Sequence, residues 1–366
     1  MLKNKVPAEL KVEELESIIA PLSTLGYAFY YPIDYSSFNY YGYDSSYYYV
    51  NGSWYTASTS NAISGTSSSD YIYGSAYTDN INAGIGNDYI EGGNGNDYVL
   101  SGAGDDYVFG GAGNDTVFGQ AGNDYIYGEA GNDVIHGNQG ADVIYGYTGN
   151  DTIYGGTEDD FAFGEQGNDR LYGDLGNDYL EGGTGADRLE GGDGNDWLFG
   201  GNYYYATGAD SADTLLGGAG SDVIYGQEGN DYAHGGIGND YVYGGTGNDT
   251  LVGGTGSDYI EAGSGNDRIT IEGGAGSSDI VYGQDGNDVI AVTGTNGYTY
   301  VSGGNGYDTI NATQFNSSNL TYNSYYGTFN SSTGSTIQVD STVEKVNVSN
   351  GAYVRNNLGG FSFQSN

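Results

Sequence analysis

The chain of 366 residues has no cysteine, eight lysine and arginine residues, three prolines and two histidines. Without cysteine, neither disulfides nor thiolate metal sites are available. The net charge of −40 disfavours binding to nucleic acid and to anionic membranes. No apolar run is long enough to span a membrane. We therefore expect no nucleic-acid partner and no membrane span, and so acidic a surface needs cations.

The motifs of common catalytic centres are also missing. No HExxH motif exists, because the only histidines, His136 and His234, stand far apart. No GxSxG elbow occurs, and a thiol nucleophile is impossible. Carboxylates that could serve as catalytic acid or base are abundant, but most of them recur at a regular spacing, which is typical of a structural repeat. We predict that the chain is not an enzyme and that both histidines lie on strand surfaces.

The first segment, residues 1–26, does not have the apolar core of a cleaved secretory signal. Leu10, Leu15, Ile18, Ile19 and Leu22 recur at helical spacing and predict a short amphipathic helix. The stretch LKVEELESIIAP also resembles the double-glycine leaders of exported bacterial peptides. It has Ala-Pro where the glycine pair should stand, so the removal of residues 1–26 stays open.

The second segment, residues 27–64, is rich in tyrosine. Fourteen of the twenty-nine residues from 27 to 55 are aromatic, with Gly, Ser, Asn and Asp between them. Neither a helical period nor a clean alternation persists, so we expect extended or turn structure.

A repeat of nine residues fills residues 65–310. Aspartate recurs every nine residues from Asp70 to Asp196, and after an insertion of eight residues from Asp213 to Asp267. Asp279, Asp288 and Asp308 add three further copies, for 25 in all. Two residues after each aspartate stands Ile, Val or Leu, with Ala in only two copies. Such a period indicates a stacked repeat architecture.

The units GGNGNDYVL, GGAGNDTVF and GGTGNDTLV match the GGxGxDxUx nonapeptide, and the chain resembles the RTX, or haemolysin-type, calcium-binding proteins. The resemblance implies that GGxGxD is a turn, that the last three residues form a strand, and that two repeats make one coil. It also implies Ca²⁺ between each turn and the turn eighteen residues later. Glycine allows backbone carbonyls to converge, and aspartate supplies the hard oxygen that Ca²⁺ prefers.

Twenty aspartates are the candidate calcium ligands. They are Asp88, Asp97, Asp106, Asp115, Asp124, Asp133, Asp142, Asp151, Asp169, Asp178, Asp187, Asp196, Asp222, Asp231, Asp240, Asp249, Asp258, Asp267, Asp288 and Asp308. Five aspartates in irregular turns are left out: Asp70 and Asp79 as a poorly liganded opening coil, Asp160 because Glu158 replaces a glycine, and Asp213 and Asp279 beside insertions.

Calcium is expected to control folding. One aliphatic side chain in nine residues makes a thin core, and stacked aspartates repel one another. The chain should therefore be disordered at submicromolar Ca²⁺ and folded at millimolar Ca²⁺. RTX proteins are typically exported by a dedicated transporter that reads a C-terminal signal. The resemblance therefore implies a bacterial protein that is secreted, extracellular or on the cell surface and has no cleaved Sec signal.

One face of the coil should be aromatic. If two repeats form a coil, residues that flank the buried aliphatic of alternate repeats point outward on the same face. On one face 18 of 24 such positions are aromatic, against five on the other. The first face includes Tyr71, Tyr73, Tyr89, Tyr107, Phe109, Tyr125, Tyr127, Phe161, Phe163, Trp197 and Phe199. The Tyr-rich segment could cover this face, copies of the chain could associate through it, or polysaccharide could bind it.

The last segment, residues 311–366, loses the repeat and reads as short strands with polar turns. By resemblance it is a strand-rich cap that carries a possible secretion signal. The sequence therefore predicts an all-β, right-handed parallel β-roll (a solenoid). It predicts a secreted calcium-binding structural protein that assembles into a fibre, sheath or surface layer. The alternatives are a carbohydrate-binding or adhesion module, or the calcium-dependent stalk of a toxin or effector system.

Overall fold

The computed structural model describes residues 47–50, 53–56, 62–202, 211–272, 274–293, 297–315, 320–323, 328–331, 335–355 and 360–365. The chain divides into two compact units, residues 1–43 and 44–366, and all described residues belong to the second. The predicted N-terminal helix and the Tyr-rich residues 27–46 lie outside the described residues. The secondary structure of the described part consists of strands alone, with no helix.

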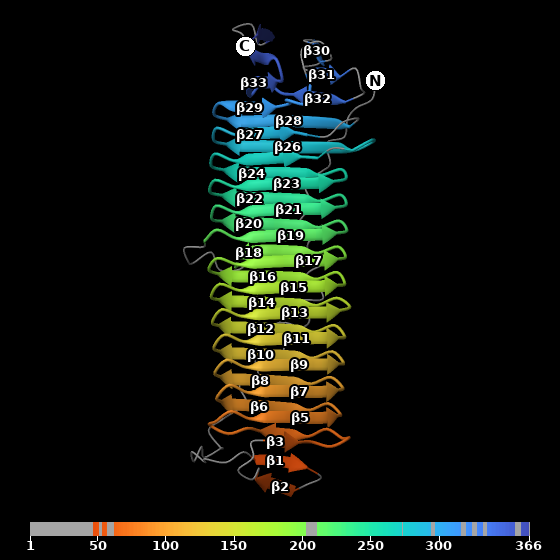
Figure 1. The fold of residues 1–366 in the computed structure, drawn as a ribbon, viewed down its shortest axis with the longest axis vertical. Coiled ribbons are helices and arrows are strands. Elements are labelled where there is room, and N and C mark those ends of the chain that lie inside the picture. The colour runs from red at the N-terminus through yellow and green to blue at the C-terminus, as the bar shows by residue number, and fades with distance from the viewer. Residues whose placement is uncertain are drawn as a thin grey trace, which may run out of the picture. The chain divides into compact units, whose positions relative to one another are not determined.

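Two parallel sheets form a roll, and the chain alternates between them (Figure 1). Tyr107 pairs with Tyr89 on one side and with Tyr125 on the other, so neighbouring strands are eighteen residues apart. At the insertion the step widens, and Leu189 pairs with Leu215. Two nonapeptides therefore make one coil, and the all-β parallel solenoid predicted from the repeat is confirmed.

The sheet that contains the aromatic positions is called sheet A. Its coil strands are β4 (Tyr71–Tyr73), β6 (Tyr89–Asn94), β8 (Tyr107–Ala112), β10 (Tyr125–Ala130), β12 (Val143–Thr148), β14 (Phe161–Gln166), β16 (Tyr179–Thr184), β18 (Trp197–Gly201), β20 (Val223–Glu228), β22 (Tyr241–Thr246), β24 (Tyr259–Ser264), β26 (Ser278–Asp285) and β28 (Tyr298–Asn305).

The opposite sheet is called sheet B. Its coil strands are β3 (Ala62–Ser64), β5 (Asn80–Ile85), β7 (Tyr98–Ala103), β9 (Thr116–Ala121), β11 (Val134–Gln139), β13 (Thr152–Thr157), β15 (Arg170–Leu175), β17 (Arg188–Asp193), β19 (Thr214–Ala219), β21 (Tyr232–Ile237), β23 (Thr250–Thr255), β25 (Arg268–Ile271), β27 (Val289–Val292) and β29 (Asp308–Asn311).

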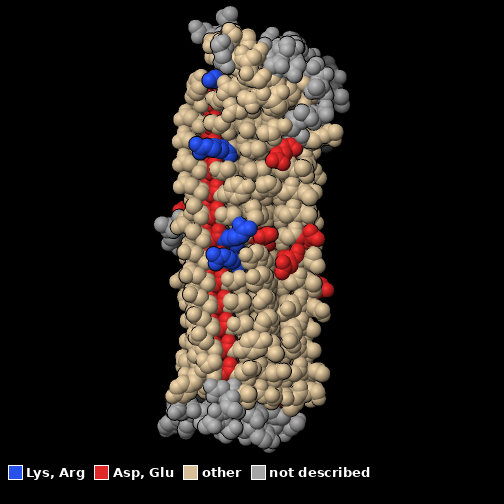
Figure 2. Space-filling model, viewed as in Figure 1, with Lys and Arg blue, Asp and Glu red and all other residues tan. Residues whose placement is uncertain are grey.

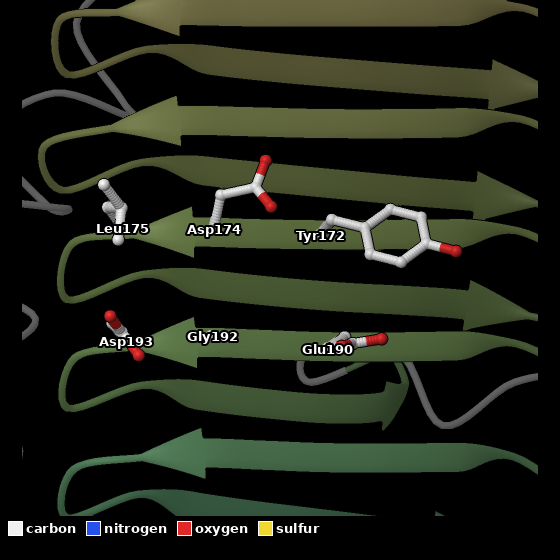
Figure 3. A pocket seen from close by; sticks show the side chains of 6 residues that line it. All are labelled: Tyr172, Asp174, Leu175, Glu190, Gly192 and Asp193. Carbon is white, nitrogen blue, oxygen red and sulfur yellow. The ribbon is translucent and has the colours of Figure 1, made fainter.

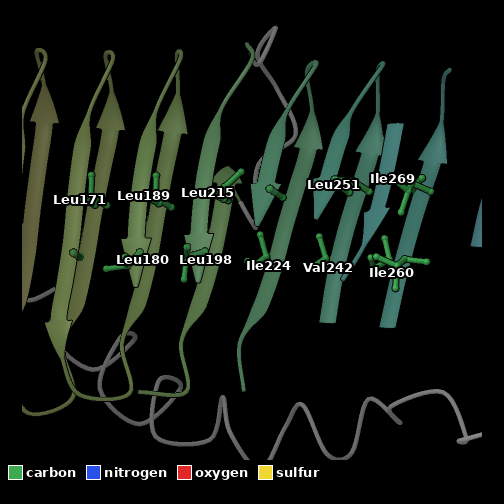
Figure 4. Packing of buried hydrophobic residues seen from close by; sticks show 14 of the residues in the cluster. Leu171, Leu180, Leu189, Leu198, Leu215, Ile224, Val242, Leu251, Ile260 and Ile269 are labelled. Atoms are coloured by element: carbon green, nitrogen blue, oxygen red, sulfur yellow. The ribbon is translucent and has the colours of Figure 1, made fainter. Parts of the chain in front are cut away.

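The core is one layer of aliphatic side chains between the two sheets. Each repeat contributes the residue two positions after its aspartate, and these side chains are fully buried (Figure 4). Leu180 and Leu198 from sheet A face Leu171 and Leu189 from sheet B in this layer. Each coil buries few apolar atoms, so the core alone gives a coil little stability.

Glycine is required where successive turns stack. Gly113 has φ 143°, and a Cβ there would lie 1.7 Å from the carbonyl oxygen of Gly95 in the coil before. No side chain fits at such a distance. The glycines therefore bring the turns close enough for oxygens of neighbouring coils to share an ion.

Additional strands continue the sheets at both ends of the roll. The hairpin of β1 (Tyr47–Val50) and β2 (Ser53–Thr56) pairs antiparallel with β4, so this part of the Tyr-rich segment extends sheet A at its edge. At the other end, β32 (Thr336–Val339) pairs with β28, and β33 (Val343–Val348) pairs with β29. The remaining strands are β30 (Leu320–Asn323), β31 (Thr328–Ser331), β34 (Gly351–Arg355) and β35 (Phe361–Ser365).

Candidate calcium sites and aromatic face

The repeat aspartates form two columns along the roll. Column A comprises Asp70, Asp88, Asp106, Asp124, Asp142, Asp160, Asp178, Asp196, Asp222, Asp240, Asp258 and Asp279. Column B comprises Asp79, Asp97, Asp115, Asp133, Asp151, Asp169, Asp187, Asp213, Asp231, Asp249, Asp267, Asp288 and Asp308. Every one of these side chains is at most 3 % exposed. Acidic side chains appear in Figure 2 as a red line along the roll.

One oxygen of each carboxylate links neighbouring coils. The backbone N–H of an aspartate donates to Oδ1 of the next aspartate in its column, at 2.7–3.2 Å. These bonds all point toward the C-terminal end of the roll. Hydrogen bonds to a charged acceptor are among the stronger ones, so each coil positions the next carboxylate.

The residues before most of the aspartates form a second ladder that sequence reasoning missed. The N–H of Asn114 donates to Oδ1 of Asn96 at 3.0 Å, and the N–H of Asn132 donates to Oδ1 of Asn114 at 2.9 Å. These bonds point toward the N-terminal end, opposite to the aspartate bonds. The signal was present in the sequence as the frequent Asn-Asp pair, since Asn, Asp and Ser accept hydrogen bonds from nearby backbone.

The second carboxylate oxygen, Oδ2, is buried and lacks a hydrogen-bond partner in 23 of the 25 aspartates. A buried, unpaired carboxylate oxygen is costly unless a cation meets it. The glycine five residues earlier leaves room beside it. A Cβ on Gly110 would lie 2.8 Å from Oδ2 of Asp115 and 2.9 Å from the carbonyl oxygen of Gly128 in the next coil. A carboxylate and a carbonyl oxygen thus line the same small space.

The turns adopt a costly conformation even where glycine is absent. At the second position of GGxGxD, eight other residues have φ between 69° and 78°: Gln120, Glu129, Asn138, Tyr147, Glu165, Asp174, Gln227 and Gln284. The left-handed region costs a side chain roughly 1–2 kcal/mol. Glu158, at the fourth position, has φ 76°. The same turn is therefore kept along the roll at the expense of local strain, as expected where turn oxygens bind an ion.

The first coil differs from all later coils. Oδ2 of Asp70 accepts from the N–H of Thr66 at 2.6 Å and from its hydroxyl at 2.8 Å. Oδ2 of Asp79 accepts from the N–H and hydroxyl of Ser75 at the same distances. Neither Thr66 nor Ser75 has positive φ. Protein donors thus occupy the position that a cation would take in later coils.

Asp160 and Asp279, in two of the remaining irregular turns, resemble the aspartates of the regular turns. In both, Oδ2 is buried and without a hydrogen-bond partner, as in interior candidate ligands such as Asp115 and Asp151. Asp160 also keeps both column bonds, at 2.7 and 2.8 Å. The turn at Asp160 is therefore not distorted as we expected. Glu158 adopts the positive φ that a glycine would have, and its carboxylate accepts a hydrogen bond from the N–H of Gly140 at 2.9 Å.

Burial perturbs the aspartate columns electrostatically. Desolvation, together with the charge of the flanking column aspartates, raises the pKa of Asp97 to about 7, of Asp124 to about 8 and of Asp160 to about 9. The backbone N–H donated to each carboxylate lowers the pKa, but by less than burial raises it. Carboxylates that are this hard to ionise need a positive counter-charge at neutral pH.

The arrangement fits Ca²⁺. The described residues contain no cluster of three or more Asp, Glu, His or Cys side chains at metal-binding distances, so backbone carbonyls must complete each site. Ca²⁺ accepts six to eight oxygens and mixes carboxylates with backbone carbonyls, whereas Zn²⁺ favours nitrogen and sulfur. The candidate aspartates would hold one ion between each turn and the next turn of the same column.

The predicted aromatic residues all lie on sheet A, where rings form an unbroken column. We define this ring column as Tyr73, Tyr89, Phe109, Tyr127, Tyr145, Phe163, Tyr179, Phe199, Tyr225, Tyr243, Tyr259, Tyr282 and Tyr300. Successive ring centroids are 4.6–6.0 Å apart. The spacing follows the coil repeat, because each coil supplies one ring.

Three glutamates would interrupt the ring column, and tyrosines bridge the gaps. Glu91, Glu181 and Glu261 stand at ring-column positions of their strands. In each case the tyrosine two residues earlier donates its hydroxyl to the glutamate, at 2.6–2.9 Å. That hydrogen bond draws its ring into the column, as in the contact of Tyr179 with Phe199 at 5.1 Å. The column is thus continuous from Tyr73 to Tyr300.

Sheet B has a shorter ladder of Tyr98, Phe118, His136, Tyr154 and Tyr172, with centroids 4.5–5.7 Å apart. His136 is sandwiched between two rings, and burial lowers its pKa. The ladder ends at a shallow depression lined by Tyr172, Asp174, Leu175, Glu190, Gly192 and Asp193 (Figure 3). These lining residues include no histidine, serine or lysine that could act as base or nucleophile.

The fold and the turn geometry define a calcium-binding repeat solenoid. A family model described as RTX calcium-binding nonapeptide repeat matches residues 64–202 and 207–292 in overlapping segments. The chain therefore belongs to the RTX calcium-binding repeat family, and it binds Ca²⁺. No curated protein matches the chain.

Among solved structures, a β-helical, Ca²⁺-dependent hyperactive antifreeze protein from an Antarctic bacterium is similar at 20% sequence identity. The match covers 85% of this chain and 97% of that chain, with a TM-score of 0.36. The described residues contain no helix long and apolar enough to cross a membrane.

Proposed function

We propose that this chain is a secreted structural protein whose roll folds when it binds Ca²⁺ and associates side by side with other copies through sheet A. The ring column is the observation that carries this proposal, because it runs from Tyr73 near one end of the roll to Tyr300 near the other. A fibre, sheath or surface layer would be the product of such contacts.

The exposure of sheet A leaves aromatic edges for a partner. Tyr71, Tyr107 and Tyr241 are 41–53 % exposed, whereas Phe199 in the middle of the ring column is 2 % exposed. In the stacked parts, such as Tyr225 with Tyr243 at 4.6 Å and 6°, the ring faces contact each other, which leaves the ring edges for a partner. Edges and hydroxyls at the coil spacing match a surface with the same repeat, which a second copy of the roll provides.

The same geometry disfavours carbohydrate binding as the alternative. Sugars stack on exposed ring faces, and the stacked rings present few of them. We therefore favour self-association over carbohydrate binding. We favour a structural role over an enzymatic one because calcium binding already accounts for the repeated aspartates.

Charge supports the coupling of calcium to assembly. A net charge of −40 keeps copies of the chain apart. Twenty Ca²⁺ ions would carry forty positive charges and neutralise the chain. Loading would thus fold the roll and remove the repulsion between rolls in the same step. Calcium is scarce in the cytosol and abundant outside cells, so both events would follow export.

A charge placed on either sheet tests this proposal. Tyr107 and Tyr241 on sheet A are each 41 % exposed, and Tyr98 and Tyr232 at the matching positions of sheet B are 40 % and 38 % exposed. We expect the wild type and Y98E/Y232E to form large regular particles at 10 mM Ca²⁺, and Y107E/Y241E to stay monomeric. Light scattering and electron microscopy measure assembly, and circular dichroism checks folding.

Two results would contradict the proposal. A wild-type roll that is folded but monomeric at every concentration would exclude self-association. Equal assembly by the two double variants would show that sheet A is not the interface.

A further inference from the structure

The last aspartate of column B meets the C-terminal cap instead of another coil. In every earlier coil of column B the aspartate N–H donates to the next aspartate. The N–H of Asp308 donates instead to Oε2 of Glu344, at 2.7 Å. A glutamate from outside the repeat thus occupies the place of the next aspartate.

A β-bulge brings Glu344 to this place. Asp308 pairs with Val343, but Thr309 pairs with Lys345, so Glu344 is the extra residue of strand β33. A bulge re-aims a side chain relative to the regular strand. The longer glutamate side chain then reaches the end of the column.

The segment before the bulge is fixed to the last repeat turn. Asp340 accepts from the hydroxyl of Ser302 at 2.6 Å, and the hydroxyl of Thr342 accepts from the N–H of Gly304 at 2.9 Å. Arg355 donates to the carbonyl oxygens of Val343 at 2.7 Å and Asp340 at 2.5 Å. The position of Glu344 is therefore held by several contacts besides its own.

Asp308 has the same unpaired oxygen as the interior aspartates. Its side chain is fully buried, and its Oδ2 lacks a hydrogen-bond partner. Burial, together with the nearby carboxylates of Asp288, Glu344 and Asp340, raises the pKa of Asp308 to about 6. Carboxylates thus surround Asp308, while the Arg355 guanidinium lies on the backbone of the same cap segment.

We propose that Glu344 is a calcium ligand, and that one Ca²⁺ held by Asp308 and Glu344 ties the C-terminal cap to the last coil. The last site of column B is then shared between the repeat and the cap. The opposite end works differently, since Thr66 and Ser75 satisfy the first aspartates with N–H and hydroxyl donors. Of the two ends of the roll, Ca²⁺ would therefore join only the C-terminal coil to the segment that caps it.

Two variants of Glu344 separate a ligand from a simple cap. E344Q keeps an oxygen that can accept the N–H of Asp308 but removes the charge, whereas E344A removes both. E228Q, an exposed glutamate in the middle of the roll, is the matched control for loss of one charge. All four chains are loaded with Ca²⁺, and bound ions are counted by equilibrium dialysis. Hydrogen exchange with mass spectrometry follows the amides of residues 335–355.

If Glu344 binds calcium, E344Q and E344A each bind one ion fewer than the wild type and E228Q. Their amides in residues 335–355 exchange at least tenfold faster, while amides of β10 and β12 are unchanged. If E344Q keeps the full number of ions and wild-type exchange, Glu344 is only a hydrogen-bond acceptor and the proposal is wrong. The result does not depend on self-association, because both measurements are made at concentrations where the chain is monomeric.

Discussion

The first coil and the interior coils differ in what surrounds the Oδ2 atoms of their buried aspartates. Each has buried aspartates whose Oδ2 needs a partner. In the first coil Thr66 and Ser75 provide an N–H and a hydroxyl. In the interior the second turn residue takes positive φ, and Oδ2 has no protein donor. In the regular turns, a positive φ at the second turn residue therefore goes together with a carboxylate oxygen that no protein donor reaches.

Removing calcium should have the largest effect, because it acts on every interior coil at once. A site at hundredfold excess of ligand over its Kd contributes about 2.7 kcal/mol, so twenty sites contribute on the order of tens of kcal/mol. We expect EGTA to abolish the β-signal in circular dichroism, and millimolar Ca²⁺ to restore it cooperatively. A chelated chain that keeps its β-structure would show that the interior coils, like the first, need no ion.

Acid should partly replace calcium in the chelated chain. Burial raises the pKa of column aspartates to between about 6 (Asp88) and about 9 (Asp160), above their usual value of 3.8. The folded chain then binds more protons than the unfolded chain. This stabilisation is full below pH 3.8 and is lost as pH rises through 6 to 9.

The pH prediction is checked on chain freed of Ca²⁺ by dialysis into metal-free buffer, because EGTA binds Ca²⁺ weakly at pH 5. We expect circular dichroism to show more β-structure at pH 5 than at pH 8, and urea to unfold the structure present at pH 5. With Ca²⁺ the order reverses, since protons compete with the ion for carboxylates. A chelated chain that is equally stable at both pH values would contradict burial as the cause.

Single aspartate substitutions test the comparison site by site. Asp151→Asn removes the charge at an unpaired interior oxygen, and we expect at least one bound ion to be lost, worth about 2.7 kcal/mol at hundredfold excess. Asp79→Asn disturbs the bonds from Ser75 but should leave the number of ions unchanged. Equilibrium dialysis counts the ions, and calorimetry gives the Tm. Loss of an ion from Asp79→Asn would mean that the first coil also binds calcium.

The smallest expected effect comes from relieving turn strain. Gln120 has φ 75°, so Gln120→Gly should stabilise the calcium-loaded roll by about 0.5–1 kcal/mol, after the entropy cost of glycine. Gln139 lies in the same sheet without positive φ, and Gln139→Gly should destabilise the roll slightly. Urea unfolding in calcium compares the two variants. A destabilised Gln120→Gly would indicate that the glutamine side chain contributes more than its strain costs.

Features that repeat could be predicted from the sequence, and features that occur once could not. The strict period of aspartate and aliphatic positions was enough to predict the two-repeat coil, the core and the alternate aromatic face, because each position does the same in every coil. The calcium assignments of the twenty aspartates stay predictions, although all share one geometry. The donors Thr66 and Ser75 depend on a local φ, and Glu344 depends on a bulge, which no period encodes.

The ring column shows the same limit. In the sequence, Glu91, Glu181 and Glu261 interrupt the aromatic residues that stand three positions after the aspartates of alternate repeats. The structure shows that Tyr89, Tyr179 and Tyr259, two residues before these glutamates, donate hydrogen bonds to them and place their rings in the gaps.

The hydrogen bonds between successive aspartates make the roll polar, so its two ends, here called poles, differ chemically. Because every N–H along a column points to the following coil, the pole at Asp308 offers a donor and the pole at Asp70 and Asp79 offers carboxylates. The two poles are chemically complementary, so no single terminating structure could serve both. A stack of identical units with such a polarity must have two different terminators, and the hairpin of β1 and β2 and the Glu344 bulge stand at opposite poles.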